Sequence, residues 1–328
     1  MAEKPYVPPF RITDTIVNLV AGINEQLGTI NVKSGISVNP LLRRENQIRS
    51  IHSTLAIENN SLSLEQVTDI INGKRVLGAV NEIREVKNAY KTYNLLSGFD
   101  PFSVNDMVKA HGVMMAGLVQ DAGHFRSGGV GIFAGTRLVH MAPPAKMVPK
   151  LIGNLIGWVK TSEAHPLIKS CVFHYEFEFI HPFLDGNGRI GRLWQTLLLS
   201  RWKPLFAWLP VEALIHEQQQ EYYCVLAAAD RAADSTVFVE FMLGAISAAL
   251  NNLLQTEQVR EQVTEQVERL LAALGQETLS AKELLNRLGL KHRQSFSSLY
   301  LQPALSLGLV EMTIPDKPNS SKQKYRAC

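Results

Sequence analysis

One segment of twelve residues, 181–192 (HPFLDGNGRIGR), concentrates the residue types that could do chemistry. Its centre, residues 185–188, predicts a tight turn whose two glycines permit positive φ and leave backbone N–H groups free to point at one spot. A helix is expected to begin directly after this turn, so its N-terminus is aimed at the same spot. Exposed N–H groups and the positive end of a helix dipole together form an anion site, and phosphate is its natural occupant.

Four side chains of this segment extend that chemistry. Arg189 and Arg192 lie three residues apart on the first turn of the expected helix and offer forked donors, which suit a polyphosphate. Asp185 supplies the hard oxygen ligand that Mg²⁺ prefers beside phosphates. Histidine titrates near neutral pH, so His181 is the candidate general base. A lone glycine turn or a lone histidine is usually structural, but their combination within twelve residues favours a catalytic site.

The chain that must position these residues has 328 residues, of which 46% are hydrophobic and 19% charged, as in a globular protein of about two domains. Apolar residues recur at three- and four-residue spacing over most of its length, which predicts an all-α fold. A glycine-rich run, 123–144, instead predicts an irregular β-hairpin that serves as a flap. Helices are expected over residues 12–28, 45–58, 62–72, 80–97, 103–118, 146–161, 166–180, 188–201, 216–231 and 236–253.

The sequence also excludes several classes of protein. The apolar stretch 239–254 contains Glu240 and Asn251, and we expect a buried helix that is too short and too polar to cross a membrane. The first ten residues lack the basic and apolar regions of a secretory signal. Three scattered cysteines argue against a disulfide framework or a zinc site. We therefore expect a cytoplasmic protein without membrane contact.

The C-terminal residues form a second compositional unit. A connector helix is expected over residues 256–267, followed by a helix from Ser280, a second helix, a turn and a weakly alternating two-stranded wing. Residues 282–328 contain eight Lys/Arg and three Asp/Glu, so their net charge is +5, whereas the whole chain has +3. The expected domains are an N-terminal helical region (1–79), a catalytic core (80–253) and a small C-terminal domain (254–328).

Residues 181–192 resemble the signature of the Fic family, His-x-Phe-x-(Asp/Glu)-Gly-Asn-Gly-Arg-x-x-Arg, at all eight fixed positions. The order of the surrounding residues is also similar over about residues 50–250, with GHFR before the flap. The resemblance implies an all-helical Fic core and transfer of AMP from ATP to a Ser, Thr or Tyr hydroxyl of a protein, the enzyme itself included. In that scheme Phe183 anchors the catalytic loop, and the active-site roles fall to His181 (base), Asp185 (Mg²⁺), Gly186, Asn187 and Gly188 (phosphate cradle), and Arg189 and Arg192 (β- and γ-phosphates).

A second segment, Thr54-Leu-Ala-Ile-Glu58-Asn59, resembles the inhibitory pattern (Ser/Thr)-x-x-x-Glu-(Gly/Asn) of the same family, on a helix at about residues 45–60. By composition alone Glu58 would be a solvated surface acid. The resemblance implies instead that Glu58 pairs with Arg192 in the place of the ATP γ-phosphate, so that the enzyme is self-inhibited. Some relatives of this layout also remove AMP, and the sequence leaves that possibility open.

Two further sets of residues are expected at the site. Flap residues 136–141 are expected to pair with an extended target segment, or alternatively only to shield the nucleotide. The flap set is Thr136, Arg137, Leu138, Val139, His140 and Met141. Tyr222, Tyr223 and Asp230 lie where the family places adenosine contacts, although a tyrosine pair is equally typical of a core or rim. Asp230 stands where the family often has asparagine, which leaves its role open.

The C-terminal domain resembles a winged helix. Its basic residues could bind DNA, and the common alternative for such domains is protein contact. Two functions therefore compete: a self-inhibited protein adenylyltransferase, and a transcription regulator whose core senses nucleotide while the winged helix acts on DNA. A homodimer is expected from its general prevalence.

Overall fold

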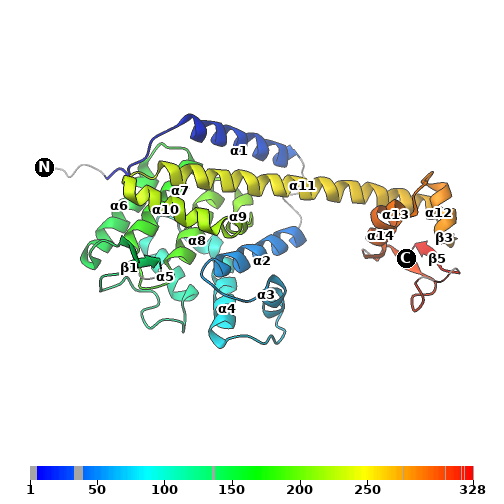
Figure 1. Ribbon diagram of the computed structural model, residues 1–328, viewed down its shortest axis with the longest axis horizontal. Helices are drawn as coiled ribbons and strands as arrows, with labels where there is room; N and C mark the ends of the chain where they lie inside the picture. Colours follow the sequence, from blue (N-terminus) through cyan, green and yellow to red (C-terminus); the bar gives the residue numbers. More distant parts are fainter. Residues whose placement is uncertain are drawn as a thin grey trace. The chain divides into compact units, whose positions relative to one another are not determined.

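The computed structural model describes residues 6–32, 40–134, 137–275, 277–306, 308–318, 320 and 322–327, except for the side chains of residues 31–32, 41, 132–140 and 257–264. The chain divides into two compact units, residues 1–251 and 252–328. The first unit is helical with one β-hairpin, so the predicted all-α fold with a flap is confirmed (Figure 1). Its helices are α1 (Asp14–Val32), α2 (Pro40–Ala56), α3 (Leu64–Ile71), α4 (Val80–Asn94), α5 (Val104–Met114), α6 (Val148–Thr161), α7 (Pro166–Ile180), α8 (Asn187–Trp202), α9 (Val211–Glu217), α10 (Gln219–Ala232) and the first part of α11 (Thr236–Leu274).

Helices α7 and α8 form the centre of the first unit and pack closely against each other. Helix α7 is buried on nearly all sides, which is typical of a core helix whose apolar residues are not confined to one face. Trp194 of α8 is fully buried, and its Nε1 donates a hydrogen bond to the Pro101 carbonyl at 3.0 Å. The segment between α7 and α8 is residues 181–186, so the two most buried helices hold the catalytic loop at both ends.

Helix α2 is fixed to this core by a buried carboxylate. Glu212 of α9 is 2% exposed and accepts hydrogen bonds from Ser50 of α2 at 2.9 Å, Tyr93 of α4 at 2.9 Å and Thr196 of α8 at 3.3 Å. A buried carboxylate is tolerated because these donors satisfy it. Glu212 therefore connects four helices, and the helix that carries Thr54 and precedes Glu58 belongs to the core of the unit.

Helix α11 differs from the expectation of two helices, 236–253 and 256–267, because it runs without a break from Thr236 to Leu274. Its sequence has no proline or glycine at the expected junction, and Thr256 Oγ1 donates to the Asn252 carbonyl at 2.8 Å. By length and composition, Thr236–Thr256 would suffice to cross a membrane, which corrects the expectation that this stretch is too short and polar. Half of the apolar window is nevertheless buried inside the protein, and α1 lies along the same part of α11 (Figure 1), where Gln26 Nε2 donates to Asn251 Oδ1 at 2.7 Å.

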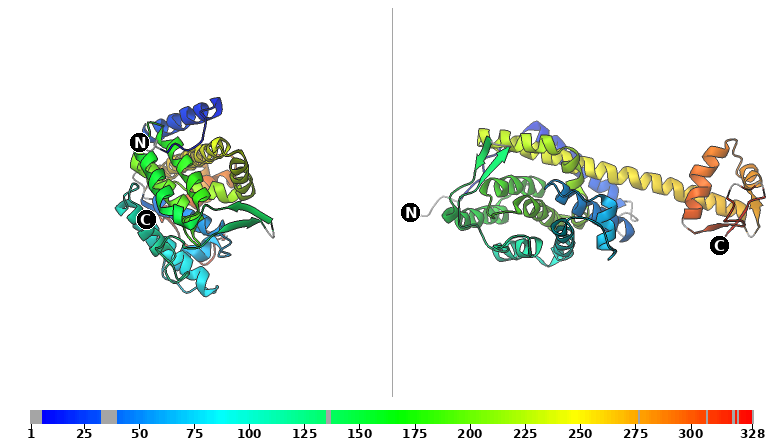
Figure 2. Two further views of the ribbon diagram at one scale, coloured as in Figure 1. Left: turned by 90° about the vertical axis from the view of Figure 1, so that its left-hand side faces the viewer. Right: turned by 60° about the horizontal axis from the view of Figure 1, so that its bottom comes forward.

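The predicted flap is an antiparallel hairpin of β1 (Gly131–Ala134) and β2 (Arg137–Met141), which extends outward from the helices (Figure 2). Gly131 pairs with Met141, and the register shifts between Ile132 and Phe133. Ala142 N donates to the Val130 carbonyl at 3.1 Å and closes the base of the hairpin. Of the predicted docking residues, Thr136 lies outside the described residues, the backbone of Arg137, Leu138, Val139, His140 and Met141 forms β2, and Met141 is 64% exposed.

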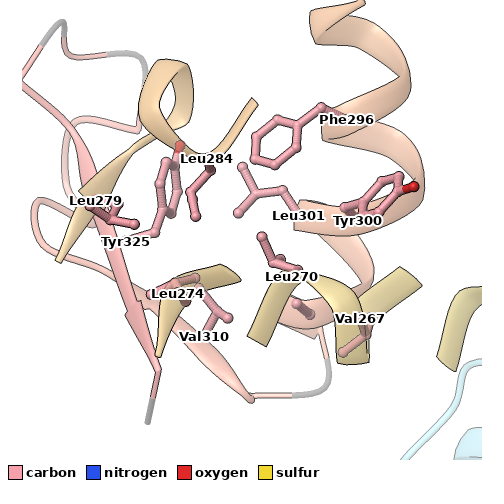
Figure 3. Close-up of a cluster of buried hydrophobic side chains, with 11 residues drawn as sticks. Val267, Leu270, Leu274, Leu279, Leu284, Phe296, Tyr300, Leu301, Val310 and Tyr325 are labelled. Atoms are coloured by element: carbon pink, nitrogen blue, oxygen red, sulfur yellow. The ribbon is translucent and has the colours of Figure 1, made fainter. Parts of the chain in front are cut away.

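The second unit contains the end of α11, short helices and a three-stranded antiparallel sheet in the order β3-β5-β4. The helix expected from Ser280 is present and starts with a capping box, in which the Ser280 and Glu283 side chains bind each other's backbone N–H groups. A cluster of buried residues, among them Leu284, Phe296 and Leu301, joins the helices to the sheet (Figure 3). The elements are β3 (Leu279–Ser280), α12 (Ala281–Arg287), α13 (Arg293–Phe296), a π-turn (Ser297–Leu301), α14 (Gln302–Ser306), β4 (Val310–Met312) and β5 (Lys324–Ala327).

Because each unit has its own core, we expect Leu284→Ala to destabilise the second unit alone, by about 2–5 kcal/mol for a fully buried leucine. All four tryptophans lie in the first unit. In denaturant unfolding, the tryptophan fluorescence transition should keep its midpoint. The far-UV circular dichroism signal should gain an additional transition at a lower denaturant concentration. Leu299→Ala, at a leucine that is 44% exposed, serves as the matched control. A parallel shift of both signals would contradict independent cores.

Candidate active site

The predicted site residues converge on one cavity of about 780 Å³ in the first unit. Its walls come from the end of α7, the catalytic loop, the start of α8, one face of α10 and Glu58 in the turn that follows α2. Residues far apart in the sequence therefore meet here. The predicted residues that line the cavity are Glu58, His181, Asp185, Gly186, Asn187, Gly188, Arg192, Tyr222, Tyr223 and Asp230.

The catalytic loop is held in shape by its own side chains. Asn187 is 2% exposed, and its amide exchanges two hydrogen bonds of 2.9 Å with the backbone of Phe183. Phe183 is fully buried and stacks on the His111 ring at 3.7 Å between centroids. The predicted anchor role of Phe183 fits this geometry. Asn187 thus braces the loop with its side chain, and its backbone lies at the expected phosphate cradle at the start of α8.

At Gly186 and Gly188, side-chain atoms of neighbouring residues lie so close to the backbone that a Cβ would not fit. Gly186 has φ +84°, and a Cβ there would lie 2.7 Å from Met115 Sδ. A Cβ at Gly188 would collide with the Glu58 carboxylate and lie 2.9 Å from Arg192 Nη1. Gly186 thus permits the turn into α8, and Gly188 makes room for the carboxylate and guanidinium groups at the N-terminus of that helix.

His181 ends α7 in the left-handed conformation, with φ 50°, and lines the cavity. Its Nδ1 lies 3.3 Å from the Glu178 carbonyl oxygen. Since a carbonyl only accepts, this contact favours the tautomer with the proton on Nδ1, so that Nε2 is the basic nitrogen. The imidazole is therefore oriented by the backbone of the preceding turn.

Asp185 stands at the wall of the cavity with its side chain 56% exposed. Its Oδ1 accepts from Gly186 N at 2.5 Å and from Arg189 Nη2 at 3.1 Å. Among the described residues there is no group of three or more His, Cys, Asp or Glu that would form a metal cage. An oriented, accessible carboxylate beside a phosphate cradle fits Mg²⁺, which usually binds through one or two carboxylates plus substrate phosphates.

Arg189, which is expected at the β- or γ-phosphate, is buried and paired with two carboxylates. It is 3% exposed, and among the described residues it does not belong to the cavity wall. Its Nη1 binds Glu85 of α4 and its Nη2 binds Asp185, both at 3.1 Å. The carboxylates of Glu85 and Asp185 hold the guanidinium, and through Asp185 Arg189 orients the predicted metal ligand. A contact of Arg189 with phosphate stays a prediction.

Arg192 and Glu58 meet across the N-terminus of α8. Arg192 is 2% exposed, and its Nη2 lies 2.6 Å from Glu58 Oε1. Its Nε donates to Thr54 Oγ1 at 2.9 Å, and Nη2 also donates to the Thr54 carbonyl at 3.0 Å. Burial alone would lower the pKa of Arg192, but the Glu58 carboxylate together with Tyr222 and Glu178 more than offsets this effect and raises it. The arginine is thus buried and charged, with its partners on the helix that the inhibitory pattern predicted.

The end of α2 directs Glu58 into the cavity. The helix proper ends at Ala56, and Asn60 N donates back to the Leu55 carbonyl at 3.1 Å. Asn59 closes this turn in the left-handed conformation with φ 67°, which asparagine adopts more readily than most residues. The Asn after Glu58 in the pattern therefore has a backbone function.

The two neighbouring tyrosines, Tyr222 and Tyr223, have different environments. Tyr222 is 2% exposed, packs against Phe238 and bonds His174 Nε2 through its hydroxyl at 3.1 Å, so it is a core residue that also forms part of the wall. Tyr223 is 47% exposed and donates to the Ile57 carbonyl at 3.3 Å. Asp230 lies on the same face of α10, at the cavity wall.

Glu178 is a cavity residue that the sequence analysis missed. Its side chain is 12% exposed, and its buried Oε1 has no hydrogen-bond partner in the described part of the chain. Burial raises the pKa of this carboxyl to about 8. The only sequence signal was a glutamate within an apolar helix, three residues before His181, and that pattern alone does not distinguish a surface position from a pocket.

Comparison with solved structures identifies the family. A crystal structure described as a Fic family protein from Desulfovibrio desulfuricans G20 is 54% identical to this chain, covers 98% of both chains and superposes with a TM-score of 0.77. The chain belongs to the Fic family. The Fic/DOC family model matches residues 101–199, and the model of the C-terminal domain of Fic-like proteins (filamentation induced by cAMP) matches residues 265–328.

Among curated Fic relatives, the chain is similar to proteins named protein adenylyltransferase. It is 28% identical to one from Culex quinquefasciatus over 61% of this chain and 40% of that protein. It is 25% identical to fic-1 of Caenorhabditis elegans over 66% of this chain and 45% of that protein. The chain thus spans less than half the length of these relatives. A structure of C. elegans Fic-1, at 21% identity and a TM-score of 0.61 over 75% of this chain and 72% of that one, shares the fold.

The buried carboxyl of Glu178 should make stability depend on pH. Its pKa is about 8 in the folded protein against an ordinary value of 4.5, so the folded protein keeps a proton that the unfolded chain loses. Raising the pH from 4.5 to about 8 therefore disfavours folding, and above that range the penalty is constant. We expect the Tm advantage of Glu178→Gln over the wild type to grow through this range. Glu221→Gln, at an exposed glutamate, is the control. A Tm difference between Glu178→Gln and the wild type that does not change with pH, as for this control, would contradict the prediction.

Proposed function

We propose that this Fic protein transfers AMP from ATP to a hydroxyl group of a protein, itself included, and that Glu58 inhibits the reaction. The observation that supports this most is the 2.6 Å pair between Arg192 and Glu58, in the same cavity as the glycine turn and His181. The names of the adenylyltransferase relatives support the reaction type. Activity and substrates are proposals for this chain.

The proposed reaction is a substitution at the α-phosphorus of ATP. The oxygen of a Ser, Thr or Tyr hydroxyl forms a bond to this phosphorus, and the bond from it to the oxygen bridging the α- and β-phosphates breaks. Pyrophosphate leaves with that oxygen, and His181 Nε2 takes the hydroxyl proton. A positioned general base contributes roughly 10²- to 10⁴-fold to such a step. Positioning and charge stabilisation supply the rest.

The remaining residues of the cavity hold the nucleotide. Backbone N–H groups of residues 187 and 188 face phosphate at the N-terminus of α8, next to the turn at Gly186, and Arg192 takes the end of the triphosphate. Asp185, braced by Arg189, would hold Mg²⁺, which when bound neutralises phosphate charge. Tyr222, Tyr223 and Asp230 are placed on the α10 wall, where the adenosine would lie.

Inhibition follows from a shared donor. A carboxylate and a phosphate both use the forked N–H groups of a guanidinium, so Glu58 and the γ-phosphate compete for Arg192. The Glu58 side chain is 30% exposed while Arg192 is 1% exposed, so Glu58 is the partner that can move away. The β1–β2 hairpin offers a strand edge on which an extended target segment can add.

We expect Glu58→Gly to raise incorporation of label from α-phosphate-labelled ATP with Mg²⁺, because Arg192 is then released to the triphosphate. Glu58→Gly combined with His181→Ala should abolish it. Glu65→Gly, at an exposed glutamate of α3, is the matched control and should behave as the wild type. Absence of label from the Glu58→Gly protein would contradict the proposed activity, and equal label with and without His181 would contradict its role as base.

A second candidate function is DNA binding by the C-terminal unit, which we propose to be a winged helix. The sheet order β3-β5-β4, with α12 to α14 between β3 and β4, supports a winged helix. Lys291 and Arg293 are exposed at the start of α13, and Lys324 is exposed on β5. If these side chains contact phosphates, the double variant Lys291→Glu, Arg293→Glu should bind duplex DNA of every sequence more weakly. The slope of log K against log salt concentration should become smaller in magnitude by about 2. Fluorescence anisotropy with no salt-dependent binding by the full chain would exclude this function.

A further inference from the structure

Arg126 is a buried arginine between α5 and the hairpin that the reaction scheme leaves without a role. It is 4% exposed. A buried guanidinium must have its donors satisfied, and a carboxylate is the usual partner. Here the side chain donates four hydrogen bonds, and every acceptor is a backbone carbonyl oxygen. The charged guanidinium of Arg126 is thus buried where all its hydrogen-bond partners are main-chain atoms.

Two of the acceptors belong to the end of α7. Arg126 Nε donates to the His181 carbonyl at 2.7 Å, and Nη2 donates to the Ile180 carbonyl at 3.2 Å. The backbone N–H of Arg126 also donates to the Pro182 carbonyl at 3.0 Å. The last carbonyls of a helix have no intrahelical partner, and an arginine can satisfy them. Arg126 therefore fixes the backbone on both sides of His181. His181 itself has a left-handed backbone conformation, which residues other than glycine rarely adopt.

The other two acceptors are at the two roots of the hairpin. Arg126 Nη1 donates to the Gly128 carbonyl at 2.8 Å, before β1, and Nη2 donates to the Pro143 carbonyl at 2.5 Å, after β2. The rigid planar fork of one guanidinium thus joins the base of the flap to the residue that carries the imidazole. A lysine has a single ammonium group and cannot reach these separated acceptors with the same geometry.

We propose that Arg126 is a positioning residue that sets the place of the flap relative to the His181 imidazole. The inference rests on the proposed function, in which the flap presents the target hydroxyl and His181 removes its proton. Arg126 touches neither the nucleotide nor the hydroxyl in this scheme. It determines the distance between the strand that holds the target and the nitrogen that takes the proton, so its loss affects turnover and leaves nucleotide binding intact.

The test uses the full chain with Glu58→Gly as parent, so that transfer is measurable. Adding Arg126→Lys should lower kcat roughly 10- to 100-fold, the range expected when a reacting group is misplaced. The ATP dissociation constant should stay that of the parent. Arg201→Lys is the matched control, because Arg201 Nη2 also binds two backbone carbonyls, those of Ser97 at 3.1 Å and Phe99 at 2.6 Å, outside the cavity wall. An unchanged kcat in the Arg126→Lys protein would overturn the proposal. Losses of kcat and of ATP affinity that are the same for Arg126→Lys and for Arg201→Lys would also overturn it.

Hydrogen–deuterium exchange keeps the proposal testable apart from the activity. Arg126→Lys should speed exchange both in residues 128–143 and in residues 180–187, whereas Arg201→Lys should affect neither. If the parent transfers no AMP, the proposed function fails and this measurement alone decides on Arg126. Faster exchange in only one of the two segments would show that Arg126 does not couple them.

Discussion

A single buried cation, the Arg192 guanidinium, is the constraint on which the rest of the site depends. An arginine that is 2% exposed requires partners, and here Thr54 and Glu58 provide them from a helix more than 130 residues away in the sequence. The proposed inhibitory contact therefore coincides with a packing contact between α2 and α8. Thr54 makes two of the three hydrogen bonds, so Glu58 can leave while α2 remains docked. Glu212 also secures the docking of α2, through its hydrogen bond with Ser50.

The second constraint is the loop between α7 and α8, where each backbone turn has a cause. His181 and Gly186 have positive φ, the Asn187 amide closes the turn onto Phe183, and Arg126 caps the end of α7. These contacts fix the imidazole and the N–H groups of α8 before any nucleotide binds. Preorganisation of this kind is what reactions governed by charge stabilisation require.

Much of this arrangement could be predicted from the sequence because the decisive residues are contiguous. Residues 181–192 contain the proposed base, the turn and both arginines, and helical periodicity located most of the elements that hold them. The pairing of Arg189 with Glu85 could not be predicted, because Glu85 lies about a hundred positions earlier and only tertiary structure brings the two side chains together. Glu178 was missed for a similar reason, since burial decides its chemistry. The expected break in α11 was wrong because a weak change of pattern is not a helix terminator.

Competition between Glu58 and the γ-phosphate for Arg192 is most directly measured by calorimetric titration of the wild type and Glu58→Gln with ATP and with AMP. Glutamine keeps the shape of the side chain and removes its charge. We expect ATP affinity to rise roughly 5- to 150-fold, the usual range for coupled sites, because the arginine is released to the phosphate. AMP has no γ-phosphate, and its affinity should stay the same. An unchanged ATP affinity, or an equal rise for ATP and AMP, would contradict the competition.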